Sequence, residues 1–234
     1  MTAVQLEPLL RRMRSLGSRR NVLGMARYGI RPARAFGLPA SELYRLSREI
    51  GRDHALARRL WATGIHDARV LAILVEDPER VSSPQMDRWA KDFDSWAVCD
   101  GACLHLFDRT PYARLKVREW SRRPEEFVKR AAFALVAALA VHDKQAPDAL
   151  FLPFLKIVSR ESDDDRNGVK KAVNWALRQI GKRNPALNGA AIRAALGIRA
   201  RGTRAARWIA ADALRELTSE KTVAMIRKRC SAGL

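Results

Sequence analysis

Two tryptophans stand at helical spacing from charged residues, and this combination could do chemistry on a positively charged substrate. Trp96 precedes Asp100 by four residues, so both side chains project from one face of a helix. Lys171, Trp175 and Arg178 have i, i+4, i+7 spacing and share a face in the same way. An indole face attracts a cation by roughly 0.5–2 kcal/mol, and nearby Lys and Arg favour the ionised form of an Asp. Such a carboxylate can stabilise a developing positive charge or orient a water molecule.

Cleavage of the N-glycosidic bond of an alkylated purine fits these requirements. The base already carries a positive charge and leaves readily, while the sugar becomes oxocarbenium-like. We therefore expect Asp100 to stabilise the sugar cation and to position the attacking water, with Trp96 and Trp175 packing against the lesioned nucleotide. Arg130 is expected on the wall of the same groove. Base release of this kind requires no lysine nucleophile, and we expect neither a metal nor a cofactor.

Asp100 occupies a position at which four similar segments have a basic residue. Each of the five segments begins with this residue and continues with small or aliphatic ones: Arg69-Val70-Leu71-Ala72, Asp100-Gly101-Ala102-Cys103, Arg130-Ala131-Ala132-Phe133, Lys171-Ala172-Val173-Asn174 and Arg207-Trp208-Ile209-Ala210. Their first residues are 31, 30, 41 and 36 positions apart, which is typical of stacked helical-pair repeats. Four basic residues in equivalent positions are expected if one face of each repeat meets an anion.

The composition indicates a polyanionic partner. The chain has 234 residues and a formal net charge of +19, so nucleic acid is the first candidate and an acidic membrane surface the second. The positive charge is concentrated in two blocks without a single acid. Residues 166–211 contain eleven Lys or Arg, and residues 11–34 contain eight Arg. Contacts of these blocks with phosphates would give affinity for nucleic acid without sequence specificity.

Several classes of protein are disfavoured by the sequence. The longest apolar run, residues 131–141, has eleven residues, against the roughly 20 that a membrane-spanning helix needs. No secretory signal is visible, and three cysteines give no disulfide framework. Cys99 and Cys103 are more readily explained as small buried hydrophobes than as zinc ligands. We expect a cytoplasmic protein, associated with the nucleoid when it binds DNA.

Helical periodicity dominates the chain, and prolines fall between the periodic segments. The pattern predicts fourteen helices, near residues 3–15, 19–28, 40–50, 53–62, 66–76, 84–92, 95–107, 110–120, 124–141, 147–159, 165–182, 186–196, 204–217 and 219–229. Ser162-Asp163-Asp164-Asp165 is predicted to be an acidic first turn. Trp61, Trp89, Trp120 and Trp208 are assigned mainly to packing. Antiparallel pairs of such short helices predict an all-α, curved α-solenoid of HEAT-like repeats with a basic concave face, forming a single domain over residues 1–234.

Four stretches of the sequence resemble a known family. They are Met25-Ala26-Arg27-Tyr28, Ser95-Trp96-Ala97-Val98-Cys99-Asp100, Val128-Lys129-Arg130-Ala131-Ala132 and Lys171-Ala172-Val173-Asn174-Trp175-Ala176-Leu177-Arg178. In this order and spacing they resemble the DNA alkylation repair glycosylases of the AlkD type, which are HEAT-repeat proteins. The resemblance covers nearly the whole chain but assigns no role to the segment before Met25.

The resemblance implies roles for individual residues. It implies that Asp100 is the catalytic carboxylate, that Trp96 and Trp175 are the lesion-facing indoles, and that Tyr28 holds the lesioned backbone. It also implies excision of positively charged N3- and N7-alkylpurines without flipping of the base. We expect the protein to act as a monomer on double-stranded DNA that contains such purines. The DNA-binding face is then expected to include Tyr28, Arg130, Lys170, Lys171, Arg178 and Arg207.

Two other functions are compatible with the same sequence. Some relatives keep the fold and bind DNA of unusual shape, and the basic blocks would serve a non-catalytic module for branched or distorted DNA without any need for Asp100. A HEAT-type scaffold for an acidic protein partner is the third alternative. Such a scaffold would bind DNA weakly and with little dependence on salt, whereas phosphate contacts weaken steeply as salt rises.

Overall fold

All regular secondary structure in residues 5–231, the residues that the computed structural model describes, is helical. This part contains fourteen α-helices and three 3-10 helices, and none of its residues lies in a strand. The all-α prediction is therefore confirmed, and each predicted helix is present. The chain forms two compact units, which we call unit 1 (residues 1–112) and unit 2 (residues 113–234). Each unit is described separately.

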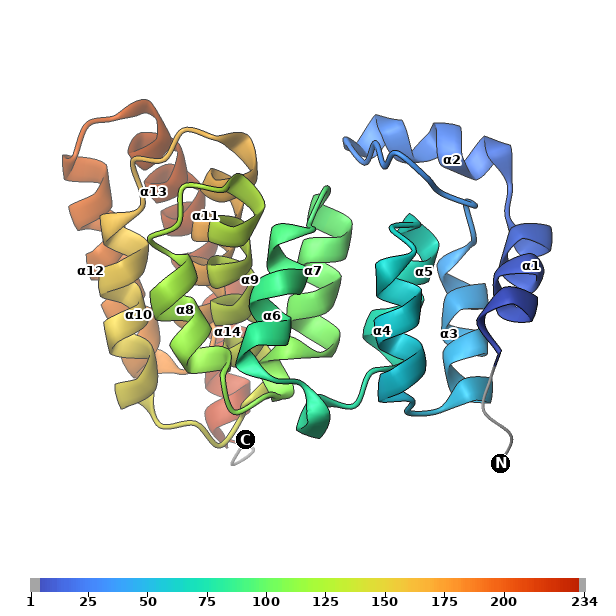
Figure 1. Ribbon diagram of the computed structural model, residues 1–234. Helices are drawn as coiled ribbons and strands as arrows, with labels where there is room; N and C mark the ends of the chain where they lie inside the picture. Colours follow the sequence, from blue (N-terminus) through green and yellow to red (C-terminus); the bar gives the residue numbers. More distant parts are fainter. Residues whose placement is uncertain (1–4, 232–234) are drawn as a thin grey trace. The chain divides into compact units, whose positions relative to one another are not determined.

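Unit 1 is built from seven α-helices. Helix α5 is at its centre, since it packs against α3, α4 and α7. Figure 1 shows the short helix α2 lying crosswise to α3, α4 and α5. The helices are α1 (Leu6–Leu16), α2 (Arg19–Met25), α3 (Ala40–Ile50), α4 (His54–Ala62), α5 (His66–Val75), α6 (Ser83–Lys91) and α7 (Trp96–His105), with the 3-10 helices η1 (Ala26–Tyr28), η2 (Pro78–Arg80) and η3 (Phe107–Arg109).

Aromatic packing joins α4 to α6 in unit 1. The indoles of Trp61 and Trp89 stack with their ring centroids 4.0 Å apart and their planes nearly parallel. Phe93 meets Trp61 edge-on, and the Trp61 Nε1–H donates to Asp92 Oδ2 at 2.8 Å. Stacked aromatic pairs add to the stability gained from burial alone. The assignment of Trp61 and Trp89 to packing is confirmed.

Side-chain caps determine where two of these helices begin. The Asp53 carboxylate accepts from the backbone N–H of Leu56 at 2.9 Å and caps α4. The Ser82 hydroxyl does the same for α6 by accepting from the N–H of Gln85, with Pro84 in the first turn. Each cap satisfies a backbone donor that has no partner within its helix. The predicted start of a helix near residue 84 is thus confirmed.

Unit 2 contains the remaining seven α-helices. They are α8 (Ala113–Trp120), α9 (Glu126–His142), α10 (Asp148–Arg160), α11 (Asn167–Gly181), α12 (Pro185–Ala200), α13 (Arg204–Leu217) and α14 (Glu220–Ser231). Helix α11 packs against α9, α12 and α13. The alanine-rich stretch 131–140 of α9 is wholly buried, because small side chains allow neighbouring helices to approach closely. Trp120 is buried in this unit, as expected.

The three aspartates that precede α11 do not form its first turn, so this prediction was wrong. Helix α11 begins at Asn167, after the acidic run has ended. Asp163 binds the Arg201 guanidinium, and Asp164 Oδ2 lies 3.4 Å from Lys129 Nζ. Asp163 and Asp164 therefore form ion pairs with Arg201, which directly follows α12, and with Lys129 of α9. They do not interact with the dipole of α11 as residues of its first turn would.

Helix α8 begins later than predicted. Pro111 disfavours helical backbone at Thr110, which is extended with ψ near 152°. The helix starts only at Ala113.

No helix in the described part of the chain is long and apolar enough to cross a membrane.

Candidate functional site

Helix α7 presents Trp96 and Asp100 away from its buried side. The helix starts at Trp96, directly after the extended residue Ser95. Its core-facing side chains are fully buried: Val98, Cys99, Ala102 and Cys103. Trp96 is 39% exposed and Asp100 is half-buried. The carboxylate is therefore partly shielded from water but not enclosed, as a group that acts on a bound substrate must be.

Asp100 lies close enough to the buried Cys103 thiol of the same helix to act on its pKa. Burial raises the pKa of the Cys103 thiol well above its usual value, and the neighbouring Cys99, Asp100 and Asp108 act in the same direction. The Cys103 thiol consequently stays protonated, and the buried side chains of Cys99 and Cys103 serve as small hydrophobes. Within residues 5–231, no group of three His, Cys, Asp or Glu side chains is arranged to hold a metal ion.

The structure brings two predicted site residues of unit 1 together. The Trp96 Nε1–H donates to the backbone carbonyl of Tyr28 at 2.8 Å, although the residues are 68 positions apart. Tyr28 ends the 3-10 helix η1, and Gly29 follows in the left-handed region with φ 73°. The Tyr28 side chain is 73% exposed. Trp96 thus fixes the backbone from which the Tyr28 ring projects into solvent.

The segment between η1 and α3 is held against α5 by a buried carboxylate. Asp67 accepts from the backbone N–H of Phe36 at 2.6 Å and of Leu38 at 2.8 Å. The Asn21 Nδ2–H donates to the carbonyl of Gly37 at 2.9 Å, which connects α2 to the same loop. An acid that accepts several backbone N–H bonds orders the loop around it. Asp67 therefore has a structural role.

A half-open apolar cavity of about 280 Å³ lies beside the Trp96 and Asp100 face of α7. Ala97 and Gly101 line it, together with His66 and the side chains of Met25, Ile30, Leu38, Leu43, Tyr44, Val70, Ile73, Leu74 and His105. Burial lowers the pKa of His66, against the opposite effect of nearby Asp67, so its imidazole is neutral at physiological pH. Ala40 and Asp67 complete the lining, which is mostly apolar with Asp67 as its one acidic residue.

Three predicted DNA-binding or lesion-facing residues of unit 2 are accessible. Lys171 on α11 and Arg207 on α13 are exposed, and Trp175 is half-buried one turn after Lys171. The Lys170 Nζ lies 5.6 Å from the centroid of the Trp208 ring. Exposed cations and indoles on neighbouring helices form a surface suited to phosphates and bases.

Arg130 departs from the expectation that it lines a DNA-binding groove. Its side chain is 8% exposed, and its Nη1–H donates to the backbone carbonyl of Gly168 at 2.6 Å. A guanidinium buried and bound in this way is not available to a phosphate. Arg130 instead connects α9 to the first turn of α11, where it satisfies a backbone acceptor.

Arg178 is paired within unit 2. Its guanidinium binds the Glu216 carboxylate and lies 3.6 Å from Asp212 Oδ2. The Lys182 Nζ donates to the other oxygen of Glu216 at 2.8 Å. Burial acts to raise the pKa of Glu216, but the contacts with Lys182 and Arg178 outweigh it, so the pKa is lowered. The charge of Arg178 is thus balanced by two acids of α13.

Arg69 follows the same rule in unit 1. Its Nη1–H donates to the carbonyl of Asp92 at 2.8 Å and lies 3.5 Å from Asp94 Oδ2. The guanidinium also lies over the Trp61 ring, 5.3 Å from its centroid. The anions near Arg69 are therefore the acids of the protein itself. The basic residues that begin the repeated segments therefore do not all face a DNA-binding surface, because Arg69 and Arg130 are bound within the protein.

Trp208 is a surface residue, which corrects its assignment to packing. It is 41% exposed and lies next to Arg207, with Lys170 above its ring. Its position in the sequence could have indicated this, because it directly follows the basic residue of the fifth repeated segment.

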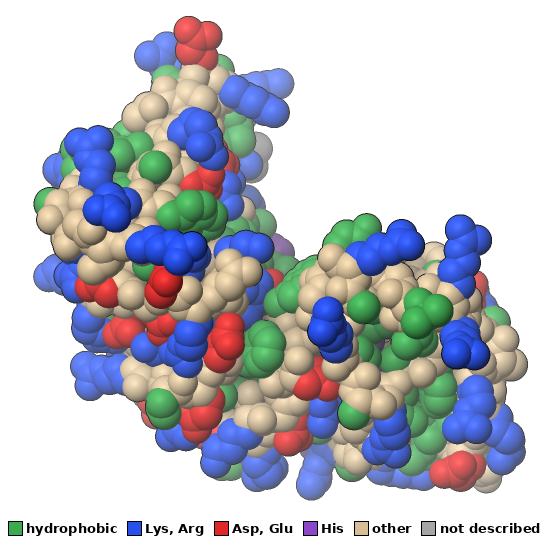
Figure 2. Space-filling view, turned by 90° about the horizontal axis from the view of Figure 1, so that it is seen from above, with side chains coloured by type: hydrophobic (Ala, Val, Ile, Leu, Met, Phe, Trp, Pro, Cys, Tyr) green, Lys and Arg blue, Asp and Glu red, His purple; other side chains and the backbone are tan. Residues whose placement is uncertain are grey.

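The space-filling view in Figure 2 shows that blue Lys and Arg side chains cover much more of the displayed face than red Asp and Glu.

The chain matches a family model described as "DNA alkylation repair enzyme" over residues 9–217. A search of the curated proteins gives no match. A solved structure matches with a TM-score of 0.74 and 19% identity, over 83% of each chain. It is described as a new family of proteins related to the HEAT-like repeat DNA glycosylases with affinity for branched DNA structures. At this identity the likeness shows the fold, and it confirms the predicted HEAT-like helical architecture.

Proposed function

This chain belongs to the DNA alkylation repair enzyme family, and on that basis we propose that it is a monofunctional DNA glycosylase. It hydrolyses the N-glycosidic bond of positively charged N3- and N7-alkylpurines in double-stranded DNA, and it acts as a monomer. The observation that carries this proposal is a half-buried carboxylate, Asp100, one helical turn after a partly exposed indole, Trp96.

Asp100 acts electrostatically in this mechanism. The cationic base departs with the electron pair of its N-glycosidic bond, and positive charge grows on the sugar. A fixed carboxylate stabilises that charge more strongly in the transition state than in the substrate, and only such a difference accelerates the reaction. The same carboxylate orients the water that attacks C1′. The partial shielding of Asp100 strengthens its interaction with the sugar, because the surroundings are less polar than water.

The aromatic and basic residues have binding roles. Trp96 and Trp175 pack against the lesioned nucleotide, where an indole face favours a cationic ring. Tyr28 contacts the DNA backbone, and the exposed Lys171 and Arg207 bind phosphates in a manner independent of sequence. Lys170 supports the Trp208 ring beside them. Together, these cationic and aromatic side chains can bind both the phosphates and the bases of a damaged duplex.

Release of 7-methylguanine or 3-methyladenine from a methylated duplex tests the proposal. Asp100→Asn retains the size of the side chain but removes its charge. We expect the excision rate to fall at least about 100-fold, which is the scale found when one preorganised electrostatic contact is lost. DNA affinity should change little, because the carboxylate makes no favourable contact with phosphate.

The matched control is Glu79→Gln, which neutralises an exposed acid of η2 in the same unit. This variant should excise at the wild-type rate. An inactive wild-type protein, or Asp100→Asn that excises as fast as the wild type, contradicts the proposed reaction. Thermal denaturation of all three proteins shows whether a loss of activity reflects a loss of folding.

A second candidate function is binding of branched or distorted DNA without catalysis. It is favoured by the description of the similar solved structure, whose family has affinity for branched DNA. Its signature is tighter binding of a four-way junction than of linear duplex, with no change in Asp100→Ala. Combined with an absence of base release, that result selects this candidate over the glycosylase.

A further inference from the structure

Helix α2 exposes an aliphatic side chain among arginines. Leu23 is 67% exposed, and no residue of α2 is fully buried. A single exposed leucine is common on protein surfaces and indicates nothing by itself. Here, however, it lies in the block of residues 11–34, which contains eight Arg and no acid. These surroundings favour a negatively charged partner for the surface around Leu23.

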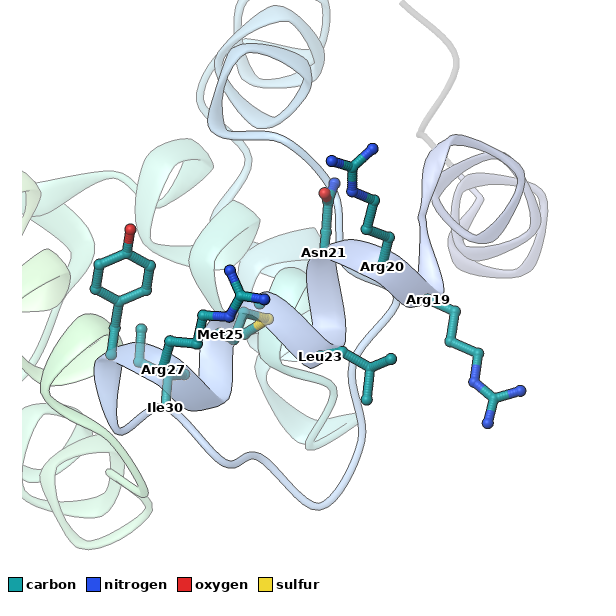
Figure 3. A pocket seen from close by; sticks show the side chains of 9 residues that line it. Arg19, Arg20, Asn21, Leu23, Met25, Arg27 and Ile30 are labelled. Atoms are coloured by element: carbon teal, nitrogen blue, oxygen red, sulfur yellow. The ribbon is translucent and has the colours of Figure 1, made fainter.

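Arg19, Leu23 and Arg27 form a stripe along this helical segment. Arg19 and Leu23 are four residues apart within α2, so their side chains emerge on the same side of the helix, and Arg27 follows one turn later in η1. Figure 3 shows Arg19 and Leu23 extending away from the neighbouring helices. All three residues line a wide, shallow recess of about 730 Å³. We call these residues the α2 stripe.

The chemistry of the α2 stripe points to one class of partner. A rise of about 1.5 Å per residue separates the two arginines by about 12 Å along the axis, with the leucine midway. Cations at this spacing can bind phosphates on both sides of a narrow groove, and the apolar side chain between them then faces the base edges. Aliphatic side chains placed in this way insert between base pairs and kink the duplex.

The stripe rests on an anchored base, as a wedge requires. On the inner side of the segment, Met25 and Ile30 contribute to the apolar cavity. Asn21 donates to the Gly37 carbonyl, and the Trp96 indole N–H donates to the Tyr28 carbonyl. The second of these bonds connects the end of the stripe to α7, the helix that carries Asp100. Force on Leu23 is therefore transmitted to an ordered scaffold.

We propose that Leu23 is a wedge that inserts between base pairs of duplex DNA from the minor groove, while Arg19 and Arg27 bind the flanking phosphates. This inference rests on the DNA binding in the proposed function, and it adds a means of recognising damage. Insertion costs less where stacking is already weak, as at an alkylated purine, a mismatch or a branch point. Leu23 would thus give the protein a preference for such sites without any contact that reads sequence.

Unstacking can be measured with duplexes that contain 2-aminopurine, whose fluorescence rises when stacking is lost. Saturating wild-type protein is expected to raise the fluorescence of a duplex with a mismatch next to the probe at least about twofold. Leu23→Ala should bind this duplex within about threefold of the wild-type affinity but lose most of the rise. Leu23→Met, which restores an aliphatic wedge, should recover it.

Two further variants separate the wedge from general DNA binding. Leu152→Ala truncates an exposed leucine of unit 2 and should behave as the wild type. Arg19→Ala combined with Arg27→Ala should weaken binding and reduce the slope of log K against log salt by about 2, since each phosphate contact contributes about 0.9. Wild-type DNA binding with a fluorescence rise that persists in Leu23→Ala overturns the wedge alone. A wild-type protein that does not bind DNA overturns the proposed function as well.

Discussion

At the scale of single residues, Trp96 combines two roles, one of its ring and one of its N–H group. Its ring is partly exposed beside Asp100, and its N–H holds the Tyr28 carbonyl. A phenylalanine at this position would keep an aromatic face for the lesion but would leave the η1 backbone without its donor. The two roles can therefore be distinguished by substitution.

Trp96→Phe is expected to lower the excision rate at limiting DNA about fivefold, because a typical hydrogen bond contributes about 1 kcal/mol net. Trp96→Ala should lose considerably more, since it removes the ring as well. Excision by the two variants under single-turnover conditions provides the measurement. Trp120→Phe is the matched control, because it changes an indole that only packs inside unit 2, and it should retain wild-type activity. Equal rates for Trp96→Phe and the wild type would show that the bond to Tyr28 is not needed.

At the scale of elements, an ion-pair network joins α11 to α13. Arg178 and Lys182 both bind Glu216, and the Asn174 Nδ2–H donates to Asp212 at 2.7 Å. The pKa of Glu216 is lowered in the folded protein, where the two cations outweigh the effect of burial. A carboxyl group with a lowered folded-state pKa stabilises the protein above its unfolded-state pKa. That contribution is lost as the pH falls through the folded-state pKa.

Glu216→Gln is therefore expected to lower the melting temperature at pH 7, by about 2–4 °C for each kcal/mol of stability lost. The difference from the wild type should shrink below about pH 4.3, the ordinary pKa of a glutamate, and vanish once Glu216 is protonated in the folded state. Thermal melts between pH 2.5 and 7 test this. Glu220→Gln, at an exposed glutamate of the same unit, is the matched control and should change the melting temperature at pH 7 much less. A constant difference at all pH values would contradict the network.

At the scale of the whole molecule, the net charge of +19 dominates the expected association with DNA. Doubling the salt concentration from about 0.1 M to 0.2 M should weaken binding roughly 20-fold if about five phosphates are contacted. Fluorescence anisotropy with an undamaged duplex measures this slope. Weak binding that is insensitive to salt would favour a scaffold for an acidic protein instead.

The local structure of this protein could be predicted closely from its sequence. Helices were expected at residues 40–50 and 204–217, and α3 and α13 have these bounds. Helix-forming periodicity and caps act within a few residues, so the chain carries this information locally. The placement of Trp96 and Asp100 on one face of α7 follows from the same local geometry. The total charge and its concentration in two blocks are properties of the sequence itself.

Only the tertiary structure decided which of the basic residues remain available to a partner. Lys171 and Arg207 are exposed, whereas Arg130 is buried against Gly168 and Arg178 is bound to Glu216, 38 positions away in each case. Exposure and ion pairing depend on residues that only folding brings together, and no periodic pattern records them. For the same reason, the surface positions of Leu23 and Trp208 became visible only in the folded chain.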